Sequence, residues 1–343
     1  MKVPVKELET RVFRTYRGGA LLAEFMGRIE DDGFQPEDWI SSFVEAKNKQ
    51  IIKNEGLTLA DCGGVCLLAD VVEREDFGVG RSDAGVLVKL LDAAERLGIQ
   101  VHPTKEYAKR IFNSEYGKTE CWHILKTRSI GGEPPCIYIG FKENITKDKW
   151  RELFERQDVS GMLQAMHKIE VKAGDTILVT GGTPHAIGAG CFMLEIQEPT
   201  DYTMRAECVT VAGERLTPMQ IHYGVGEDNM LDCFEYVGVS EQQLRSHVFL
   251  KPSESENFPS LVHLVSYSDT PCFALDAVRG GLYRHKSDSF VTLIVTENGG
   301  NMSYGGRTVS LLRGEKYFIP ANSEVTLEGV FGLLSYPPKT QNK

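Results

Sequence analysis

The chain has 343 residues, of which 41% are hydrophobic and 25% are charged, and its formal net charge is −10. This is ordinary globular composition, and the length corresponds to two or three domains. Nucleic-acid binding needs a basic face, which an acidic chain without a block of Lys or Arg does not offer. The first residues lack the apolar core of a signal peptide, and no window is long enough to span a membrane. We therefore expect a cytoplasmic protein with neither a nucleic-acid nor a membrane partner.

The eight cysteines are scattered along the chain and form no CxxC pair. In a chain of this length, such spacing favours reduced thiols. Cys62 and Cys66 are closest in sequence, and a redox or metal role for them is the alternative. We expect all eight cysteines to be free.

The first 80 residues predict few regular elements, apart from a short helix opened by Pro36. Residues 86–91, VLVKLL, favour a buried strand, although a short apolar run is also compatible with a helix. We expect a helical turn over residues 92–97 and then a second strand over residues 99–102, which Pro103 ends.

Alternating patterns predict strands over residues 118–126 and 136–141. Residues 146–171 are the clearest helical stretch, because apolar residues recur there at spacings of three and four. Residues 217–236 predict partly helical structure. After about residue 260, many short apolar runs separated by Gly, Asn and Asp turns predict a β-sandwich or barrel.

Two segments share one pattern: AGDTILVTGGTPHAI at residues 173–187 and RGEKYFIPANSEVTL at residues 313–327. Each has a glycine and an acid, an apolar strand and a turn of small residues. His185 in the first copy corresponds to Val325 in the second. The pattern indicates two related β-barrels with a polar site kept only in the first, unless the short match arises by chance.

Four residues are candidate metal ligands. Gln100 and His102 are two apart on a predicted strand, so both point to one side. Glu120 lies on another predicted strand, and His185 follows the glycine-rich turn. Imidazole and oxygen ligands suit Zn, Fe, Ni or Cu. Spacing alone does not prove such a site.

Three further residues accompany this group. Lys118 and Trp122 share the face of Glu120 on its strand, and Trp122 either lines the cavity or packs in the core. Arg205 follows the strand after His185, where a guanidinium can hold a phosphate or a developing oxyanion. The alternative for Arg205 is a surface ion pair with Asp201 or Glu207.

Taken together, the runs IQVHP, YGKTECW, GDTILVTGGTPHAIGAG and LEIQEPTDYTMR resemble class I mannose-6-phosphate isomerase, a metal-dependent cupin family. The resemblance covers residues 35–215 and extends more loosely over the C-terminal part. It implies one zinc ion per chain, held by Gln100, His102, Glu120 and His185.

The resemblance also implies roles for other residues. Arg205 is expected to be catalytic, and Lys118 and Lys89 are expected near the sugar phosphate, with Trp122 beside them. Glu195 matches a carboxylate of the family's active site. Glu195 and Lys118 are both candidates for the base that carries the proton, and the sequence does not choose between them.

The implied reaction interconverts mannose 6-phosphate and fructose 6-phosphate through a metal-stabilised cis-enediol. One alternative is a cupin metalloenzyme of another type, because Fe(II) oxygenases also use two histidines and a carboxylate. Another is a sugar-phosphate-binding cupin without catalysis. The intact Arg205 and Glu195 favour the isomerase.

The predicted fold is therefore mostly β, with two related cupin (jelly-roll) barrels and a helical segment between or beside them. We expect a catalytic domain over residues 1–200, a partly helical connection over residues 201–257 and a C-terminal barrel over residues 258–343.

Overall fold

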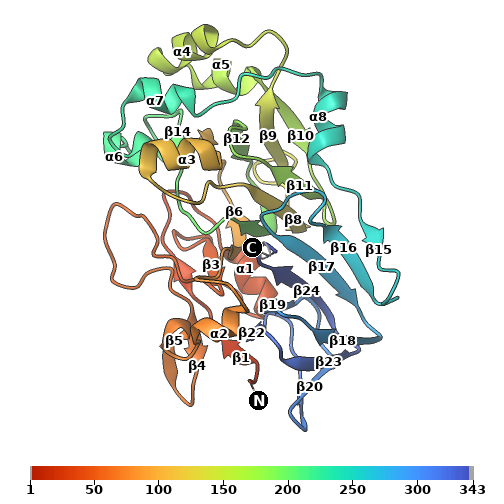
Figure 1. The fold of residues 1–343 in the computed structure, drawn as a ribbon. Helices are drawn as coiled ribbons and strands as arrows, with labels where there is room; N and C mark the ends of the chain where they lie inside the picture. The colour runs from red at the N-terminus through yellow and green to blue at the C-terminus, as the bar shows by residue number, and fades with distance from the viewer. Residues whose placement is uncertain (1, 340–343) are drawn as a thin grey trace.

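The structure, a computed structural model, describes residues 2–339. Its strands form four sheets in which neighbouring strands run antiparallel, and the sheets make two barrels (Figure 1). The mostly-β prediction is confirmed. Among the described residues, no helix is long and apolar enough to cross a membrane.

Two sheets enclose the first barrel. The six-stranded sheet has the order β11 (Thr176–Val179), β8 (Glu120–Thr127), β13 (Cys191–Gln197), β6 (Leu87–Ala93), β3 (Glu37–Ile40) and β2 (Arg11–Val12). The five-stranded sheet has the order β10 (Met166–Glu170), β9 (Cys136–Phe141), β12 (His185–Ile187), β7 (Gln100–Val101) and β14 (Met204–Arg205). Side chains such as Ile124 and Met193 from one sheet and Ile139 and Ile187 from the other form the core between them.

The second barrel also has two sheets. The larger one has the order β15 (Ser253–Glu254), β16 (Leu261–Val265), β17 (Ala274–Arg279), β24 (Phe331–Tyr336), β19 (Val291–Val295), β22 (Lys316–Ile319), β1 (Val5–Glu7), β4 (Leu59–Asp61) and β5 (Val65–Leu67). The smaller one has the order β18 (Leu282–Lys286), β23 (Glu324–Glu328), β20 (Asn301–Tyr304) and β21 (Arg307–Ser310). Three strands from the N-terminal part of the chain thus complete a sheet of the C-terminal barrel.

The two barrels repeat one topology. In the first, β11, β8, β13 and β6 are successive neighbours, and in the second β22, β19, β24 and β17 follow one another in the same way. The glycines that precede β11 and β22, Gly174 and Gly314, both have positive φ, of 91° and 87°, a conformation that glycine adopts without steric cost. Val325 on β23 is buried where the first barrel has His185 on β12. The predicted pair of related barrels is therefore confirmed, whereas the exact domain boundaries stay a prediction.

The barrels pack against each other through the outer face of the six-stranded sheet. All seven residues of β6 and all seven of β13 are buried, because one face of each strand points into the first barrel and the other meets the second. Val88 and Leu194 on these strands belong to the same apolar cluster as Leu275 and Phe318 of the nine-stranded sheet. Strands covered on both faces need the nearly continuous apolar runs that the sequence shows.

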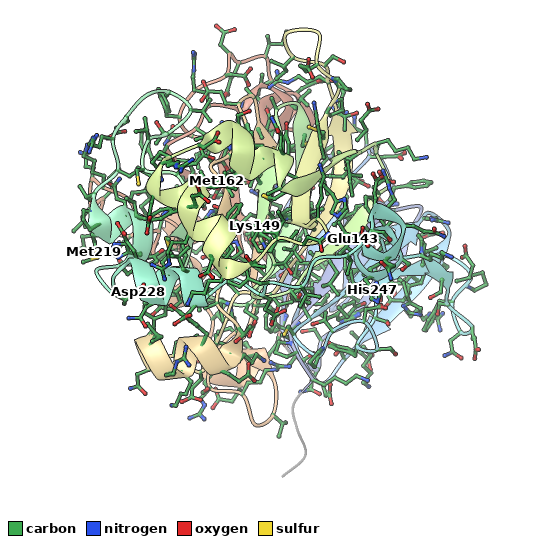
Figure 2. All side chains as sticks on the ribbon, turned by 90° about the horizontal axis from the view of Figure 1, so that it is seen from above. Glu143, Lys149, Met162, Met219, Asp228 and His247 are labelled. Carbon is green, nitrogen blue, oxygen red and sulfur yellow. A yellow bond between two sulfur atoms is a disulfide. The ribbon has the colours of Figure 1, made fainter. Side chains whose placement is uncertain are left out.

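Helices cover the five-stranded sheet of the first barrel (Figure 1). They are α3 (Lys105–Phe112), α4 (Lys147–Glu155), α5 (Val159–Gln164), α6 (Pro218–His222), α7 (Glu227–Asp232) and α8 (Glu241–Val248). Figure 2 looks down on this helical layer, with Lys149 and Asp228 on α4 and α7. Buried Trp150 and Met162 pack with Phe141 of β9 and so fix α4 and α5 on the sheet. Three shorter elements lie nearer the N-terminus: α1 (Ala20–Phe25), η1 (Leu68–Asp70) and α2 (Arg74–Phe77).

Several sequence predictions of local structure are confirmed. Residues 86–91 lie in or beside strand β6, residues 136–141 form β9, and the segment 217–236 contains α6 and α7. Three predictions are wrong. The stretch after Pro36 is strand β3, residues 92–97 contain no helical turn, and the expected helix over residues 146–171 is two short helices followed by strand β10.

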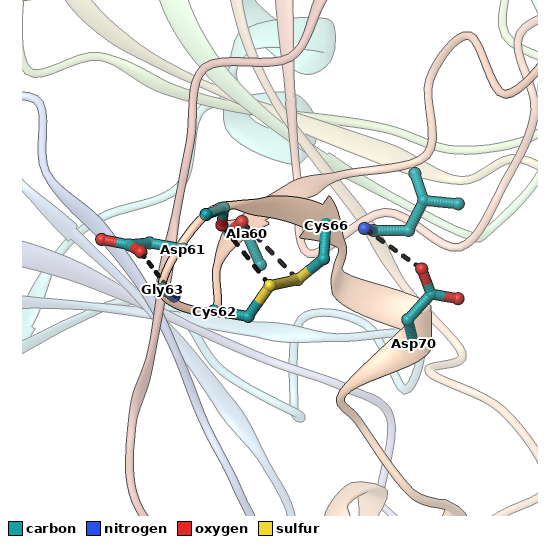
Figure 3. The surroundings of a disulfide bond; sticks show 8 residues. Ala60, Asp61, Cys62, Gly63, Cys66 and Asp70 are labelled. Carbon is teal, nitrogen blue, oxygen red and sulfur yellow. Dashed lines mark hydrogen bonds between the residues drawn. A yellow bond between two sulfur atoms is a disulfide. The ribbon is translucent and has the colours of Figure 1, made fainter.

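The prediction that all eight cysteines are free is also wrong. Cys62 and Cys66 form a disulfide across the hairpin of β4 and β5, which Figure 3 shows. The two residues flank the turn, so pairing of the strands brings their side chains together. The other six cysteines are free.

Candidate active site

Cross-strand pairing aligns three candidate residues in one row of the five-stranded sheet. His185 on β12 lies directly opposite Gln100 on β7, and Gln100 lies opposite Arg205 on β14. Directly opposed residues of neighbouring strands project to the same face of a sheet. His185 and Arg205, which are 85 and 105 positions from Gln100 in sequence, are thereby each placed beside Gln100.

The six-stranded sheet contributes a second row. Glu195 on β13 is opposite Lys89 on β6 and, on its other side, Trp122 on β8. Glu120 begins β8 and lies opposite Gln197 of β13. Period-2 alternation places Glu120 and Trp122 on one face, which is the face that looks into the barrel. The two sheets therefore bring their polar rows together across the interior.

His102, Glu120 and His185 form a group whose candidate ligand atoms all lie within 4.8 Å of one another. His102 Nε2 is 3.1 Å from Glu120 Oε2, and His185 Nε2 is 3.5 Å from Glu120 Oε1. All three side chains are at most 1% exposed. Gln100 joins them, with its amide nitrogen 3.2 Å from His185 Nε2, and a half-turn of the amide presents the oxygen instead.

Backbone carbonyls orient both imidazoles. His102 Nδ1 is 2.9 Å from the carbonyl oxygen of Tyr202, and His185 Nδ1 is 2.9 Å from that of Thr183. Each ring therefore donates its proton from Nδ1, which leaves the Nε2 lone pair facing the centre of the group. This arrangement fixes the tautomer that a metal ligand requires. The glycine-rich turn before His185 supplies the carbonyl of Thr183.

The electrostatic environment keeps the group in its metal-binding protonation states. Burial lowers the pKa of His102 to about 3, and the nearby Lys118 ammonium adds to this effect. Burial also lowers the pKa of His185. For Glu120, burial alone would raise the pKa, but Lys118 and the two imidazoles lower it well below the usual value. Two neutral imidazoles and one carboxylate are the forms that bind a divalent cation.

The Lys118 side chain is a cation already held by this group. Its Nζ is 2.6 Å from His102 Nε2 and donates a hydrogen bond of 2.8 Å to Glu120 Oε2. The ammonium thus contacts the same two atoms that would bind a metal ion, His102 Nε2 and Glu120 Oε2. The predicted ligands fit a cation, and metal binding requires Lys118 to turn away from them.

Lys89 and Glu195 form a buried ion pair beside the ligand group. Lys89 Nζ is 3.0 Å from Glu195 Oε1, and both residues are 3% exposed. Burial raises the pKa of Glu195, and Lys89 only partly opposes that effect. Burial alone would lower the pKa of Lys89, but Glu195 and Glu37 together raise it. The Lys89 ammonium also lies 4.9 Å from the ring centre of Trp39, a cation–π contact.

Arg205 does not form either of the surface ion pairs considered from the sequence. Asp201 pairs with Arg14, and Glu207 pairs with Arg96. Arg205 donates to the carbonyl oxygen of Gln220 at 2.5 Å. Among residues 2–339 no carboxylate lies within ion-pair distance of it, so its charge remains available to an anion.

A narrow cavity of about 70 Å³ connects these groups, with Lys89, Gln100, Lys118, Glu195 and Arg205 in its lining. An outer cavity of about 370 Å³ shares Arg14 and Thr15 with it. Arg14 and Thr15 therefore separate the two cavities.

The sequence analysis missed four residues that line this narrow cavity: Arg14, Tyr16, Glu37 and Asp201. Glu37 accepts hydrogen bonds from Tyr16 at 2.6 Å and from Trp39 at 2.7 Å, and Arg14 Nε is 2.9 Å away. The sequence did contain one signal: Glu37 stands two residues before Trp39. A carboxylate in a buried strand needs polar partners, so its presence there indicates a polar site.

Trp122 lies behind the ligands. It is fully buried and its ring meets that of His185 edge-on, with centres 5.5 Å apart. Its indole Nε1 has no hydrogen-bond partner among the described residues. Trp122 therefore packs in the core, which was one of the two positions expected from the sequence. Its contact with substrate stays a prediction.

Sequence comparison connects this site with known proteins. Over 191 residues the chain is 40% identical to the mannose-6-phosphate isomerase ManA of Bacillus subtilis, which is 55% of this chain and 56% of that protein. It is also 40% identical over 133 residues to the mannose-6-phosphate isomerase of Streptococcus mutans, covering 38% of this chain and 39% of the relative.

The chain is similar in sequence to mannose-6-phosphate isomerases. The matched segments span only about half or less of these two relatives, and no protein-family model matches the sequence. The fold likeness is wider. The crystal structure of the mannose 6-phosphate isomerase from Bacillus subtilis superposes with a TM-score of 0.73 at 21% identity, covering 97% of this chain and 99% of that one. The mannose-6-phosphate isomerase resemblance and the cupin-barrel fold are thus confirmed.

Proposed function

We propose that this protein is an enzyme that interconverts mannose 6-phosphate and fructose 6-phosphate. One observation carries the proposal: a buried Lys–Glu pair and an arginine without a carboxylate partner line one cavity, and Gln100 and Lys118 of the same lining contact the three-residue metal-ligand group. Aldose–ketose isomerisation needs a Lewis acid at the sugar oxygens, a base for the carbon-bound proton and a cation for the anionic groups. The names of the curated relatives support the same reaction.

We assign one Zn²⁺ per chain to His102, Glu120 and His185, with Gln100 as a fourth ligand. Two imidazole nitrogens and a carboxylate oxygen form a ligand set that zinc enzymes use. When bound, the metal supplies Lewis-acid polarisation of the substrate's carbonyl oxygen, worth several kcal/mol. The Nδ1 contacts with the carbonyls of Tyr202 and Thr183 hold the two imidazoles in position for it.

Glu195 is our choice for the base. The reaction moves a proton between C2 and C1 of the open-chain sugar through a cis-enediol, so one group can remove it and return it on the same face. Burial raises the pKa of Glu195 and so strengthens it as a base. Lys118, which lines the same cavity, is the other candidate that the sequence left open.

Lys89 positions the base and Arg205 meets the anionic groups of the substrate. Lys89 holds the Glu195 carboxylate at 3.0 Å and stays charged beside it. Of the cavity's cations, Arg14, Lys89 and Lys118 each face a carboxylate. Arg205 is bound only to backbone carbonyl oxygens among the described residues. An incoming phosphate or enediolate therefore finds its uncompensated charge there.

The inner cavity of about 70 Å³ is smaller than a hexose phosphate requires, since ligand cavities usually hold about 300–1,000 Å³. The substrate must therefore also use the outer cavity of about 370 Å³ beyond Arg14. We also propose a cytoplasmic location, because six of the eight cysteines are free.

The proposal is tested by a coupled assay of mannose 6-phosphate conversion before and after chelation, with Zn²⁺ added back. Turnover that stops with chelator and returns with zinc supports both the reaction and the metal. A metal-loaded protein that does not convert mannose 6-phosphate contradicts the proposal. In that case, consumption of O₂ with Fe(II) would identify an oxygenase, and substrate binding without turnover would identify a sugar-phosphate-binding cupin.

A further inference from the structure

We infer that the junction between the two barrels holds a second anion site, centred on Arg81, that binds a phosphate monoester away from the catalytic cavity. Arg81 lies in the loop that leads into β6. This loop contacts the C-terminal barrel, because Gly78 forms a β-bridge with Ser289 and the amide of Phe290 donates to the carbonyl oxygen of Phe77 at 3.3 Å. The inference does not depend on the isomerase proposal.

Arg81 is a buried cation without a counter-charge. It is 8% exposed, and its Nε has no hydrogen-bond partner among residues 2–339. One terminal nitrogen donates to the carbonyl oxygen of Pro338. Within the part of the chain that the structure describes, no carboxylate forms an ion pair with it, although burying an unpaired charge is costly.

The nearby acids do not neutralise Arg81. Asp83 accepts hydrogen bonds from Tyr116 at 2.7 Å and from Ser82 at 3.0 Å. Asp288 is exposed and lies beyond ion-pair distance. Burial lowers the pKa of Arg81 more than these acids raise it.

Arg81 lines a cavity of about 340 Å³ whose lining side chains are all charged or carry a hydroxyl group. Four hydroxyl side chains, those of Tyr267, Ser287, Ser289 and Tyr336, share the lining with a second cation, Lys339. The Lys339 ammonium lies 4.8 Å from the ring centre of Tyr267, which holds it over the cavity.

The chemistry of this lining matches a phosphate monoester. Two cations and the two serine hydroxyls can satisfy the phosphate oxygens, and the planar guanidinium binds two of them at once. The Tyr267 hydroxyl already donates to the carbonyl oxygen of Pro337 at 2.5 Å. The cavity is larger than a bare phosphate ion needs. Asp288 also lines it, and its carboxylate repels phosphate but accepts a hydrogen bond from a sugar hydroxyl. No residue of this cavity lines the catalytic one.

The test uses calorimetric titration of the full-length, zinc-loaded protein with inorganic phosphate and with glucose 6-phosphate. The background variant is Arg205→Ala, which weakens the proposed catalytic anion site. We expect it to keep one phosphate site per chain. Adding Arg81→Gln should weaken that binding roughly 10- to 100-fold, the loss of a charged hydrogen-bonding partner. Adding Arg284→Gln, the same change at an exposed position of the C-terminal barrel, should leave it unchanged.

The inference fails if Arg205→Ala binds no phosphate, or if Arg81→Gln leaves the affinity unchanged. Binding of phosphate but not of glucose 6-phosphate would overturn the monoester assignment. If Arg81→Gln does not fold, as judged by circular dichroism and thermal unfolding, Lys339→Gln takes its place, because Lys339 is exposed. Weaker binding by that variant supports the site and unchanged binding refutes it. Mannose 6-phosphate turnover by Arg81→Gln alone should equal that of the unsubstituted protein, which separates this inference from the proposed function.

Discussion

Lys89 and Glu195 lie directly opposite each other on adjacent antiparallel strands, with Nζ and Oε1 3.0 Å apart in the interior. Neither residue can be replaced alone without leaving an uncompensated buried charge or a shifted pKa on its partner. Lys89 also lies 4.9 Å from the ring centre of Trp39, and both members of the pair line the inner cavity. The same ion pair is buried in the barrel and holds the proposed base, Glu195. A substitution at either residue should therefore change both the stability of the barrel and the activity.

Glu195→Gln should keep the metal but lose most of the activity. The amide preserves the shape of the side chain but cannot take a proton from carbon, so we expect kcat to fall by about 10²- to 10⁴-fold. Zinc content should stay at one per chain, since Glu195 is not a ligand. A variant with kcat within a few-fold of the unsubstituted protein would transfer the base role to another group, with Lys118 the next to examine.

His185→Ala should abolish zinc binding, because it removes one of three converging ligand atoms. His123→Ala is the matched control: His123 lies on β8, and its Nδ1 contacts Thr176 Oγ1 at 2.9 Å instead of the ligand group. Metal analysis after dialysis against zinc-containing buffer measures the outcome. Equal zinc content in the two variants would mean that the ligand assignment is wrong.

Arg205→Ala should leave the zinc in place and lower kcat/KM by roughly 10²- to 10³-fold, the usual effect of removing a group that stabilises developing negative charge. Arg205→Lys should recover part of the loss, because it restores the charge but not the two-pronged geometry. Steady-state kinetics with exposed Arg215→Ala as control would test this. Unchanged kinetics for Arg205→Ala would show that Arg205 has no role in catalysis and only a structural one, through its hydrogen bond to the carbonyl oxygen of Gln220.

The interface between the barrels should make stability depend on pH through Glu7. Burial raises the pKa of Glu7 from 4.5 to about 7, against hydrogen bonds from Ser41 that lower it. The folded state therefore binds the proton more tightly than the unfolded chain. Its contribution to stability is fully present below pH 4.5 and is lost as the pH rises through 7.

Glu7→Gln removes this dependence. Relative to the unsubstituted protein, the variant should gain about 2–3 kcal/mol in unfolding free energy between pH 5 and pH 8. Urea denaturation at the two pH values gives the comparison. A difference between the two proteins that stays constant with pH would show that Glu7 ionises in the folded protein as it does in the unfolded chain.

The disulfide predicts a specific thiol count. A denatured sample without reductant should show six reactive thiols, and a reduced one should show eight. Cys62→Ser should leave turnover unchanged, because neither cysteine lines the catalytic cavity. Eight thiols in the unreduced sample, prepared with alkylation of free thiols at lysis, would show that the pair is not formed in the cell.

The sequence predicts much of the site because the residues concerned lie within short, ordered motifs. Alternation on one strand placed Lys118 and Glu120 on the same face, and their side chains are indeed in contact. Cross-strand contacts are different. That Gln100 would lie opposite both His185 and Arg205 depends on strand register, which no local pattern determines.

The wrong secondary-structure predictions and the missed site residues also result from strand pairing. The segment after Pro36 became a strand because β3 is held between β2 and β6, whatever its local preference. Residues 166–170 fit helical spacing and strand alternation alike, and pairing with β9 decided between them. Arg14 and Glu37 were missed because their contact depends on the pairing of β2 with β3, which no local pattern showed.

The pairing of β1 with β22 has a consequence for how the protein is made. Val5 is opposite Phe318, so β1 meets this partner only after β22 has been synthesised. Contacts so distant along the chain slow folding, and an unpaired strand edge exposed in the meantime promotes aggregation. We therefore expect β1 to depend on chaperones until β22 has emerged from the ribosome. A fragment that ends before residue 316 would leave β1 paired on one side alone, with β4.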